Sequence, residues 1–281
     1  MPQAKVISEV FGDVVPLGEQ NATVRHDADH RFVKIHVIPV SPTEARFRVA
    51  AEAAYRVFEI VFASVGLIVA LPLMLATAIV IRLDSPGPVL FFHIRPARSV
   101  RVRGRDLEGR TDLIPPPGGY DRDALYYAPS YFKLIKFRTM YRDAQARFPE
   151  CYYSAYAREN FRSTFAHTQN DPRVTRVGRV LRKLSVDELP NLWSVVVGDM
   201  RLVGPRPEAT EVLQYYTPEE MIKFTIKPGI TGLAQVSGRK LLNWGDTLAL
   251  DLEYVRTRSV ALDMKIILLT IKRVMTMHGA L

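Results

Sequence analysis

Cysteine is almost absent from this chain of 281 residues, because Cys151 is the only one. A single thiol cannot form an internal disulfide, which excludes the disulfide-rich secreted scaffolds and favours the cytosolic side of a membrane. The first twenty residues also lack the basic start and the apolar core of a signal peptide. A chain of this length can bury a sizeable core as one large or two small domains.

Acidic residues are in short supply: 38 lysines and arginines face 29 aspartates and glutamates, and the formal net charge is +9. This excess predicts an anionic partner, which could be a nucleic acid, a membrane surface or a phosphorylated ligand. Zinc-finger spacing, RNP-like aromatic motifs and basic-zipper heptads are all missing. We therefore expect no nucleic-acid partner and keep a membrane-associated nucleic-acid binder only as an alternative.

One apolar run stands out against this charge. Ile60 to Ile81 holds 22 residues without a charge, and about 20 are enough for a membrane helix. A buried core helix is the alternative, but core helices seldom run so long without a polar face. Pro72 sits near the middle and predicts a kink, leaving halves of about 14 to 18 Å that are each too short for a hydrocarbon core of ~30 Å.

Basic residues flank the apolar run on both sides. Cytoplasmic flanks carry the positive excess, so a spanning helix usually shows an asymmetry. Symmetric flanks favour a Pro-broken re-entrant helix, over about 56–82, that enters and leaves on the cytoplasmic face rather than crossing. The flanking arginines are Arg46, Arg48 and Arg56 before the run, and Arg82, Arg95, Arg98, Arg101, Arg103 and Arg105 after it.

The remaining composition suggests how the chain is organised. Residues 1–45 read as an accessory N-terminal segment in which "RFVKIHVIPV" alternates like a short strand. A turn at "DSPGP" precedes a predicted strand over 89–93. Residues 99–130 are charged and rich in Pro and Gly, which predicts a flexible insertion.

Two helices are predicted after residue 170. "NDPRVTRVGRVLRKL" places Val174, Val177, Leu181 and Leu184 on one face and arginines at every third position, either as a solvated face or as a basic face on anionic lipid. A second helix is expected from Ser185 to Val197, ended by a glycine. The apolar tail "LDMKIILLTIKRVMTMHGAL" suits a surface-docked helix or core.

The dyad Asp187–Glu188 lies at the start of that second helix. "SVDE" matches the S-x-x-E capping box, a purely local stabiliser. At a helix start, however, the positive end of the dipole keeps carboxylates ionised and attracts phosphate. An ionised Asp beside a bound phosphoanhydride is what nucleophilic phosphoryl transfer requires. The pair alone favours the cap.

Three stretches after residue 130 carry side chains that suit a phosphate ligand. "KLIKFRTM" places two cations on alternate residues of a predicted strand, hence on one face. "GDMRLVGPRP" sets arginines in a Gly/Pro turn, and "KPGITGLAQVSGR" surrounds polar residues with glycines that permit close backbone approach. The candidates are Lys136, Arg138, Arg201, Arg206, Gln235 and Arg239.

Together these motifs resemble the bacterial sugar transferase family, the monotopic phosphoglycosyl transferases that act on polyprenyl phosphate. The likeness rests on "KFRTM", "NDPRVTRVGRVLRKLSVDELPNLWSVVVGDMRLVGPRP", "KPGITGLAQVSGR" and "LDLEYVRTRSVALDMKIILLT", and covers roughly residues 50–281. It implies an α+β fold, mainly helical with a small β-hairpin element, in a membrane-anchored domain over 46–281. The family's re-entrant helix breaks at a proline, which matches Pro72.

The resemblance also implies an activity. The family transfers a sugar 1-phosphate from a nucleotide diphosphate sugar, usually a UDP-sugar, to polyprenyl phosphate at the cytoplasmic face of the bacterial inner membrane. It implies that Asp187 is the nucleophile and that Glu188 assists proton transfer or organises Mg²⁺, with both carboxylates as metal ligands. By motif position Lys136, Arg182, Arg206 and Gln235 hold phosphate or nucleotide, with Arg201 and Arg239 as further candidates.

Two departures from the family pattern set limits on this expectation. The stretch before "KFRTM" is longer than the usual short hairpin, and residues 141–168 are also extended, so both could reshape the sugar pocket or a subunit contact in a homo-oligomer. A non-catalytic membrane scaffold that keeps the fold without the activity is the alternative function.

Overall fold

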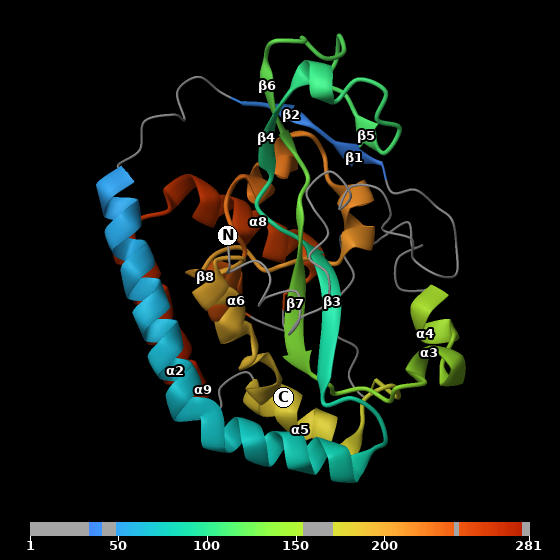
Figure 1. Cartoon of the computed structure of the whole chain (residues 1–281), viewed down its shortest axis with the longest axis vertical. Coiled ribbons are helices and arrows are strands. Elements are labelled where there is room, and N and C mark those ends of the chain that lie inside the picture. The colour runs from blue at the N-terminus through green and yellow to red at the C-terminus, as the bar shows by residue number, and fades with distance from the viewer. Residues whose placement is uncertain (1–33, 41–48, 154–170, 239–241, 277–281) are drawn as a thin grey trace, which may run out of the picture. The chain divides into compact units, whose positions relative to one another are not determined.

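The computed structural model describes residues 34–40, 49–153, 171–238 and 242–276 (Figure 1). Its longest element is the helix α2, Val49–Asp84, whose 36 residues run through Pro72 without a break. An 18-residue stretch within Glu52–Asp84 has a mean hydropathy of 2.5, and 11% of that stretch is buried. A core helix would be mostly buried, so this exposure favours the membrane interpretation over the core-helix alternative.

The ribbon of α2 changes direction part-way along (Figure 1), as expected for a helix that contains an internal proline. Before Pro72, a Cβ added at Gly66 would lie 3.4 Å from Leu192, so the helix lies close to α6 (Asn191–Val197) there. After Pro72, Ile81 joins a small core with Leu181. The two parts of α2 are therefore held by different elements.

Two seven-residue strands run antiparallel beside this helix. β3 (Leu90–Pro96) pairs with β7 (Tyr131–Phe137) in a continuous register from Leu90↔Phe137 to Pro96↔Tyr131. The predicted strands are thus confirmed, and the expectation of a mainly helical fold with a small β-hairpin element holds.

The insertion over 99–130 contains regular structure, which corrects the expectation of a flexible loop. β1 pairs in parallel with β5, and β2, β6 and β4 form a three-stranded sheet. The elements are β1 (Ile35–His36), β2 (Ile38–Pro39), β4 (Val100–Arg103), the short 3-10 helix η2 (Gly104–Asp106), β5 (Leu113–Ile114) and β6 (Leu125–Ala128).

This small β unit folds because a few apolar residues scattered among charges are buried. Leu107, Leu113, Tyr126 and Tyr127 are all buried, and Tyr120 packs edge-on against Tyr126. Composition averages hide such residues, which is why the charged and Pro/Gly-rich stretch read as a loop. The strands of the 1–45 segment pair with the insertion, so residues 34–40 belong with the domain that was expected to start at 46.

After β7, the described residues form helices and two short strands. Its elements are α3 (Ala144–Arg147), α4 (Glu150–Tyr153), α5 (Arg176–Leu184), η4 (Val186–Glu188), α6, β8 (Arg201–Val203), η5 (Thr210–Tyr215), η6 (Glu219–Thr225), β9 (Gly229–Thr231), α7 (Leu233–Ser237), α8 (Trp244–Thr257) and α9 (Val260–Thr276). β8 and β9 pair in parallel.

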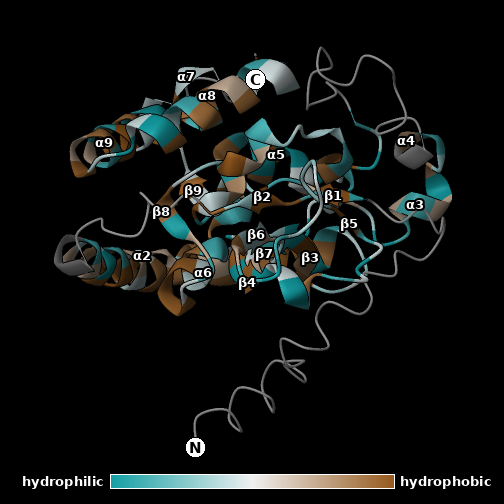
Figure 2. Cartoon of the chain, turned by 90° about the horizontal axis from the view of Figure 1, so that it is seen from above, coloured by the Kyte–Doolittle hydropathy of each residue, from teal (hydrophilic) through white to brown (hydrophobic). Residues whose placement is uncertain are grey.

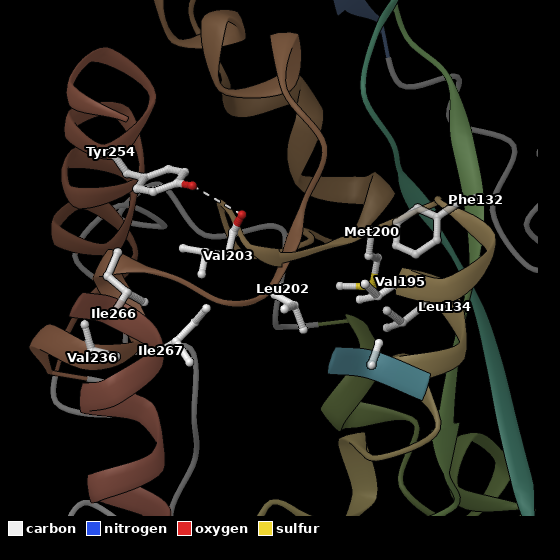
Figure 3. Close-up of a cluster of buried hydrophobic side chains, with 11 residues drawn as sticks. Phe132, Leu134, Val195, Met200, Leu202, Val203, Val236, Tyr254, Ile266 and Ile267 are labelled. Atoms are coloured by element: carbon white, nitrogen blue, oxygen red, sulfur yellow. Dashed lines mark hydrogen bonds between the residues drawn. The ribbon is translucent and has the colours of Figure 1, made fainter. Parts of the chain in front are cut away.

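The main core lies between β7, α6, β8 and the two C-terminal helices (Figure 3). Tyr254 of α8 is fully buried, and its hydroxyl donates to the carbonyl oxygen of Val203 and to the Oδ1 atom of Asp263. Ile266 and Ile267 of α9 complete one side of this core, while Phe132 and Leu134 of β7 complete the other.

Exposed large hydrophobic side chains lie on α2, α6 and α9, and the ribbons of these three helices include hydrophobic stretches (Figure 2). The tail helix α9 was predicted to be either a surface-docked helix or part of the core, and it is both. Ile266 and Ile267 are buried, while another set of its apolar residues is exposed. The exposed set is Val260, Met264, Leu268, Ile271 and Val274.

Candidate active site

The helix predicted from Ser185 to Val197 is divided into η4 and α6, which corrects the capping-box expectation. Ser185 adopts a left-handed conformation with φ 58° and ends α5, and its side chain makes no capping hydrogen bond to η4. The helix α6 begins only at Asn191 and ends at Gly198, whose φ is 97°. The predicted glycine stop is confirmed, but the dyad does not sit at the start of a long helix.

Glu188 instead points to the strand β7. The Nζ atom of Lys136 lies 2.6 Å from its Oε1 atom, and both side chains are partly buried. The spacing of β7 from the dyad is set by Asn191, whose Oδ1 accepts the backbone N–H of Ile135 at 3.1 Å. One side-chain amide therefore aligns the strand that carries Lys136 with the turn that carries the dyad.

Asp187 is the buried member of the dyad, with an exposed fraction of 8%. Burial and, to a smaller extent, the charge of Glu188 raise the pKa of its carboxyl to about 6, against the opposing charges of Lys136, Arg182 and Arg206. These three cationic side chains therefore counteract the desolvation of the carboxylate.

Arg182 reaches the dyad from the last turn of α5. Its Nε donates to Thr139 Oγ1 at 2.8 Å, and although burial lowers the pKa of its guanidinium, the charge of Asp187 acts in the opposite direction. A Cβ at Gly178 would lie 2.1 Å from the carbonyl oxygen of Thr139. Gly178 therefore permits the close approach of α5 to "KFRTM" that brings Arg182 to Asp187.

Arg206 enters from the loop between β8 and η5. The loop starts where β8 and β9 nearly touch, because a Cβ at Gly204 would meet the Gly229 nitrogen at 2.7 Å. The backbone N–H of Gly204 donates to the Thr231 carbonyl oxygen at 2.9 Å, and that of Gly229 donates to the Pro205 carbonyl oxygen at 2.9 Å. This backbone pairing holds the loop beside the dyad.

Two of the predicted arginines are engaged elsewhere. Arg138 is buried, and its guanidinium donates to Ser85 Oγ, to the Ser85 carbonyl oxygen and to the Pro88 carbonyl oxygen at 2.6 to 2.8 Å. It follows the last residue of β7 instead of sharing the face of Lys136 within the strand. Arg138 thus secures the turn between α2 and β3.

Arg201 is likewise buried and pairs with α2. Its Nε lies 3.2 Å from Glu59 Oε1, its Nη1 lies 3.2 Å from Glu52 Oε2, and its guanidinium stacks over the ring of Tyr55. The carboxylates raise the pKa of this arginine even though burial acts against them. Arg201 therefore joins β8 to the membrane helix.

Gln235 stands on α7 in a tightly packed corner. Both polar atoms of its side chain are buried and lack a hydrogen-bond partner within the described parts of the chain. A Cβ at the neighbouring Gly232 would meet Gln235 Oε1 at 2.8 Å. Arg239 lies outside the described residues.

The dyad supplies the type of oxygen ligand that Mg²⁺ prefers. The residues described in the structure contain no cluster of three or more His, Cys, Asp or Glu side chains that could hold a metal. Mg²⁺ is commonly held by one or two carboxylates together with substrate phosphates, and Asp187 with Glu188 supplies such a pair. The repulsion between the two carboxylates, which raises the pKa of Asp187, is a charge imbalance that a cation relieves.

Sequence patterns missed several residues that build this site. The Thr139 hydroxyl accepts from the Arg182 side chain, while Gly178 and Asn191 contact backbone atoms of distant elements. In the sequence all three resemble ordinary turn or helix residues. The buried trio Glu208, Lys223 and Asp251 was also missed. The only local signal was Glu208, the acid that follows the Gly/Pro turn in "GPRPE". Its partner Lys223 lies 15 residues away on η6, so the ion pair could not be recognised from that stretch.

Comparison with known proteins agrees with this geometry. The family model described as bacterial sugar transferase matches residues 50–102 and 122–277. The unmatched interval therefore falls within the insertion, between β4 and β6.

Three curated relatives cover most of the chain. It is 36% identical to the UDP-glucose:undecaprenyl-phosphate glucose-1-phosphate transferase of Caulobacter vibrioides, over 83% of this chain and 74% of that protein. It is 33% identical to the exopolysaccharide production protein ExoY of Rhizobium meliloti, over 81% and 88%. It is 34% identical to the UDP-N-acetylgalactosamine-undecaprenyl-phosphate N-acetylgalactosaminephosphotransferase of Aeromonas hydrophila, over 74% of this chain and 40% of that protein.

The matched intervals contain β3, β7, the dyad and every described cation around it, and they leave out residues 103–121 of the insertion. With the fold, the dyad and the sequence matches in agreement, this chain belongs to the bacterial sugar transferase family.

Proposed function

We propose that the chain transfers a sugar 1-phosphate from a nucleotide diphosphate sugar to polyprenyl phosphate and so begins the assembly of an exopolysaccharide, O-antigen or related glycan. The observation that carries this proposal is the setting of Asp187, a buried carboxylate at which the charges of Lys136, Arg182 and Arg206 converge. The names of the relatives support the same reaction class.

In the first step an oxygen of Asp187 bonds to the phosphorus that carries the sugar. The bond from that phosphorus to the bridging oxygen of the diphosphate breaks, and its electron pair leaves with the nucleoside monophosphate, UMP for a UDP-sugar. In the second step an oxygen of polyprenyl phosphate bonds to the same phosphorus and the Asp187 carboxylate departs. A covalent phosphosugar on Asp187 is the intermediate.

The surrounding cations act on charge that develops during the transfer. Arg182 and Arg206 approach Asp187 from two different elements, so they can hold the phosphate oxygens on two sides. Lys136 pairs with Glu188, which limits the repulsion that this second carboxylate exerts on the nucleophile. When bound by Asp187 and Glu188, Mg²⁺ would supply further screening between the dyad and the phosphates.

The long helix α2 places this chemistry at a membrane. We propose that it enters and leaves on the cytoplasmic face of the inner membrane, with Pro72 at the break. Its exposed apolar side chains, its change of direction (Figure 1) and the arginines that flank it on both sides support this topology.

The covalent mechanism is tested with the full chain in lipid nanodiscs, a UDP-sugar panel and undecaprenyl phosphate, with UMP release as the readout. Asp187→Asn is expected to lower turnover by at least about a thousandfold, as removal of a nucleophile does elsewhere. Without acceptor, the wild-type chain should carry a phosphosugar on the peptide that contains Asp187. Asp143→Asn is the matched control, because it makes the same substitution at an exposed aspartate. An Asp187→Asn variant that releases UMP at the wild-type rate would refute the mechanism.

The same panel identifies the sugar. Relatives named for glucose and for N-acetylgalactosamine are similarly close to this chain, at 36% and 34% identity. Overall identity therefore does not select between these sugars, whereas the ratio of kcat/KM values across the panel does.

The topology is tested by cysteine labelling. Because Cys151 is the only cysteine, Cys151→Ser gives a thiol-free background for the single substitutions Ala53→Cys and Pro86→Cys. Both positions are exposed and lie near the two ends of α2. Both thiols should react with a membrane-impermeant reagent from the cytoplasmic side. Labelling from opposite sides would refute the re-entrant helix and support a crossing.

A further inference from the structure

A buried ionic cluster lies behind the loop that carries Arg206. The Nζ atom of Lys223 lies 2.7 Å from Glu208 Oε1, 2.9 Å from Asp251 Oδ2 and 3.1 Å from the Tyr216 hydroxyl. Lys223 has an exposed fraction of 2% and Asp251 of 0%. The proposed chemistry uses none of these groups.

The charges of this cluster are strongly bound to one another. Burial by itself would raise the pKa of Glu208, yet the Lys223 ammonium outweighs burial and holds that pKa below its usual range. Burial would likewise lower the pKa of Lys223, but Asp251 and Glu208 hold it well above the usual value. A buried ion pair is weak evidence for added stability, because hydrophobic residues of similar volume often stabilise a protein equally well. A second possible role of such a pair is to fix the positions of the segments that it joins.

The cluster connects three elements that are far apart along the chain. Lys223 belongs to η6, Asp251 to α8, and Glu208 to the loop that follows β8. Tyr216 packs edge-on against Trp244 and Phe224, at centroid distances of 5.2 and 5.1 Å. The Lys223 ammonium lies over the Tyr216 ring. Because the Lys223 side chain is almost fully buried, it can act on a substrate only through the groups that it holds.

The group that it holds is the Arg206 loop. Glu208 lies two residues after Arg206 and is held by Lys223. Burial raises the pKa of the Asp251 carboxyl, while Lys223 and, least of all, the backbone of Arg206 act to lower it. At its other end the loop is held by the backbone bonds of Gly204 and Pro205 to β9. Arg206 thus sits between two fixed points, of which the ionic cluster is one.

We propose that Glu208, Lys223 and Asp251 form a positioning cluster that sets Arg206 against Asp187. The cluster acts through the loop, and none of its members touches the reacting atoms. This inference rests on the proposed function, because it assigns Arg206 a place at the transferred phosphate.

The test is a double-mutant cycle that joins Glu208→Gln with Arg206→Ala, measured as kcat/KM for the UDP-sugar. Glu208→Gln keeps the shape of the side chain and removes the charge that pairs with Lys223. Alone it should lower kcat/KM about tenfold, within the range of coupling between residues of one network. In the Arg206→Ala background it should have almost no further effect, because the side chain that it positions is gone.

Asp263→Asn is the matched control. Asp263 is as deeply buried as Lys223 and accepts a hydrogen bond from Tyr254 at 2.6 Å, but it belongs to another part of the core. The fold loss of kcat/KM caused by Asp263→Asn should be the same with and without Arg206→Ala, as expected for a general loss of stability. If Glu208→Gln multiplies in the same way, the positioning role is refuted.

A shorter acid covers the case in which Glu208→Gln does not fold. Glu208→Asp keeps the charge and withdraws the carboxylate by one methylene, so it should lower kcat/KM in the wild-type background but not in Arg206→Ala. Equal losses in both backgrounds would refute the inference.

Asp187→Asn, assayed alongside, separates the two claims. If Asp187→Asn is inactive while the losses of kcat/KM from the Glu208 and Arg206 substitutions multiply, the positioning role is refuted and the proposed function stands. If it retains full UMP release, the proposed function itself fails.

Discussion

Two pairs of arginines show how differently the same residue type is used in this protein. Arg182 and Arg206 converge on Asp187, and both act electrostatically on its carboxyl. Arg138 and Arg201 are buried among carbonyl oxygens, hydroxyls and carboxylates of the α2 region. All four come from motif stretches, so motif membership alone does not assign an arginine to the active site.

The number of occupied donors separates the two pairs. The guanidinium of Arg138 makes three hydrogen bonds to the 85–88 turn, and that of Arg201 contacts two glutamates. Within the described residues, no side-chain hydrogen bond is recorded for Arg206. Arg182 makes one such bond, to Thr139. An arginine with several donors engaged by the fold stabilises the fold, whereas one with most of its five donors available beside a carboxylate is suited to bind phosphate.

The largest effect in this comparison is expected for stability at Arg201. Arg201→Ala leaves the fully buried Glu59 with only its longer ion pair to Arg56, at 3.7 Å, and removing one partner from a buried ion pair typically costs about 3–5 kcal/mol. Chemical unfolding in detergent micelles measures it. Turnover per folded molecule should stay near wild type, and a loss of turnover without loss of stability would place Arg201 in the active site after all.

The next largest effect is expected for catalysis at Arg206. Arg206→Ala should lower kcat/KM by about a hundredfold, in the range found when one donor to a developing charge is removed. Unfolding should shift little, since the loop is held by backbone bonds and by Glu208. Arg182→Ala is the companion variant, and a similar loss is expected. Normal turnover in both would remove the proposed phosphate-binding role.

A smaller effect on stability is expected at Arg138. Arg138→Ala removes three donors from partly buried acceptors of the 85–88 turn, a loss of about 1–3 kcal/mol. Arg138→Lys is the control, because one ammonium cannot replace all three bonds and should recover only part of the stability. An unchanged unfolding midpoint together with a raised KM would reverse the assignment and bring Arg138 to the substrate.

The smallest effect is expected at Gln235. Gln235→Leu removes two buried polar atoms that lack partners in the described structure, so unfolding free energy should change by less than about 1.5 kcal/mol and can rise. If Gln235 serves the nucleotide, KM for the UDP-sugar should increase at the same time. A loss of stability with unchanged KM would show that the amide has only a structural role.

Much of the fold could be predicted because its signals are local. The apolar run of α2, the glycine that ends α6 and the strand that carries Lys136 all follow from short-range patterns. The β insertion could not be predicted, because two of its strands, β5 and β6, pair with residues 35–39, more than seventy positions earlier, and because it depends on a few buried tyrosines. The capping-box prediction was wrong for a related reason, because the Glu188 carboxylate pairs with Lys136 of β7.

The sequence by itself indicated the family, the long apolar helix and the Asp187–Glu188 dyad as a candidate site, since these rest on contiguous motifs. Only the tertiary structure decided which arginines meet the dyad and which secure α2. The hydrogen-bond partners that decide it lie 53 residues away for Arg138 and 142 residues away for Arg201. Partners at such separations are brought together by tertiary packing, which short-range sequence patterns do not predict.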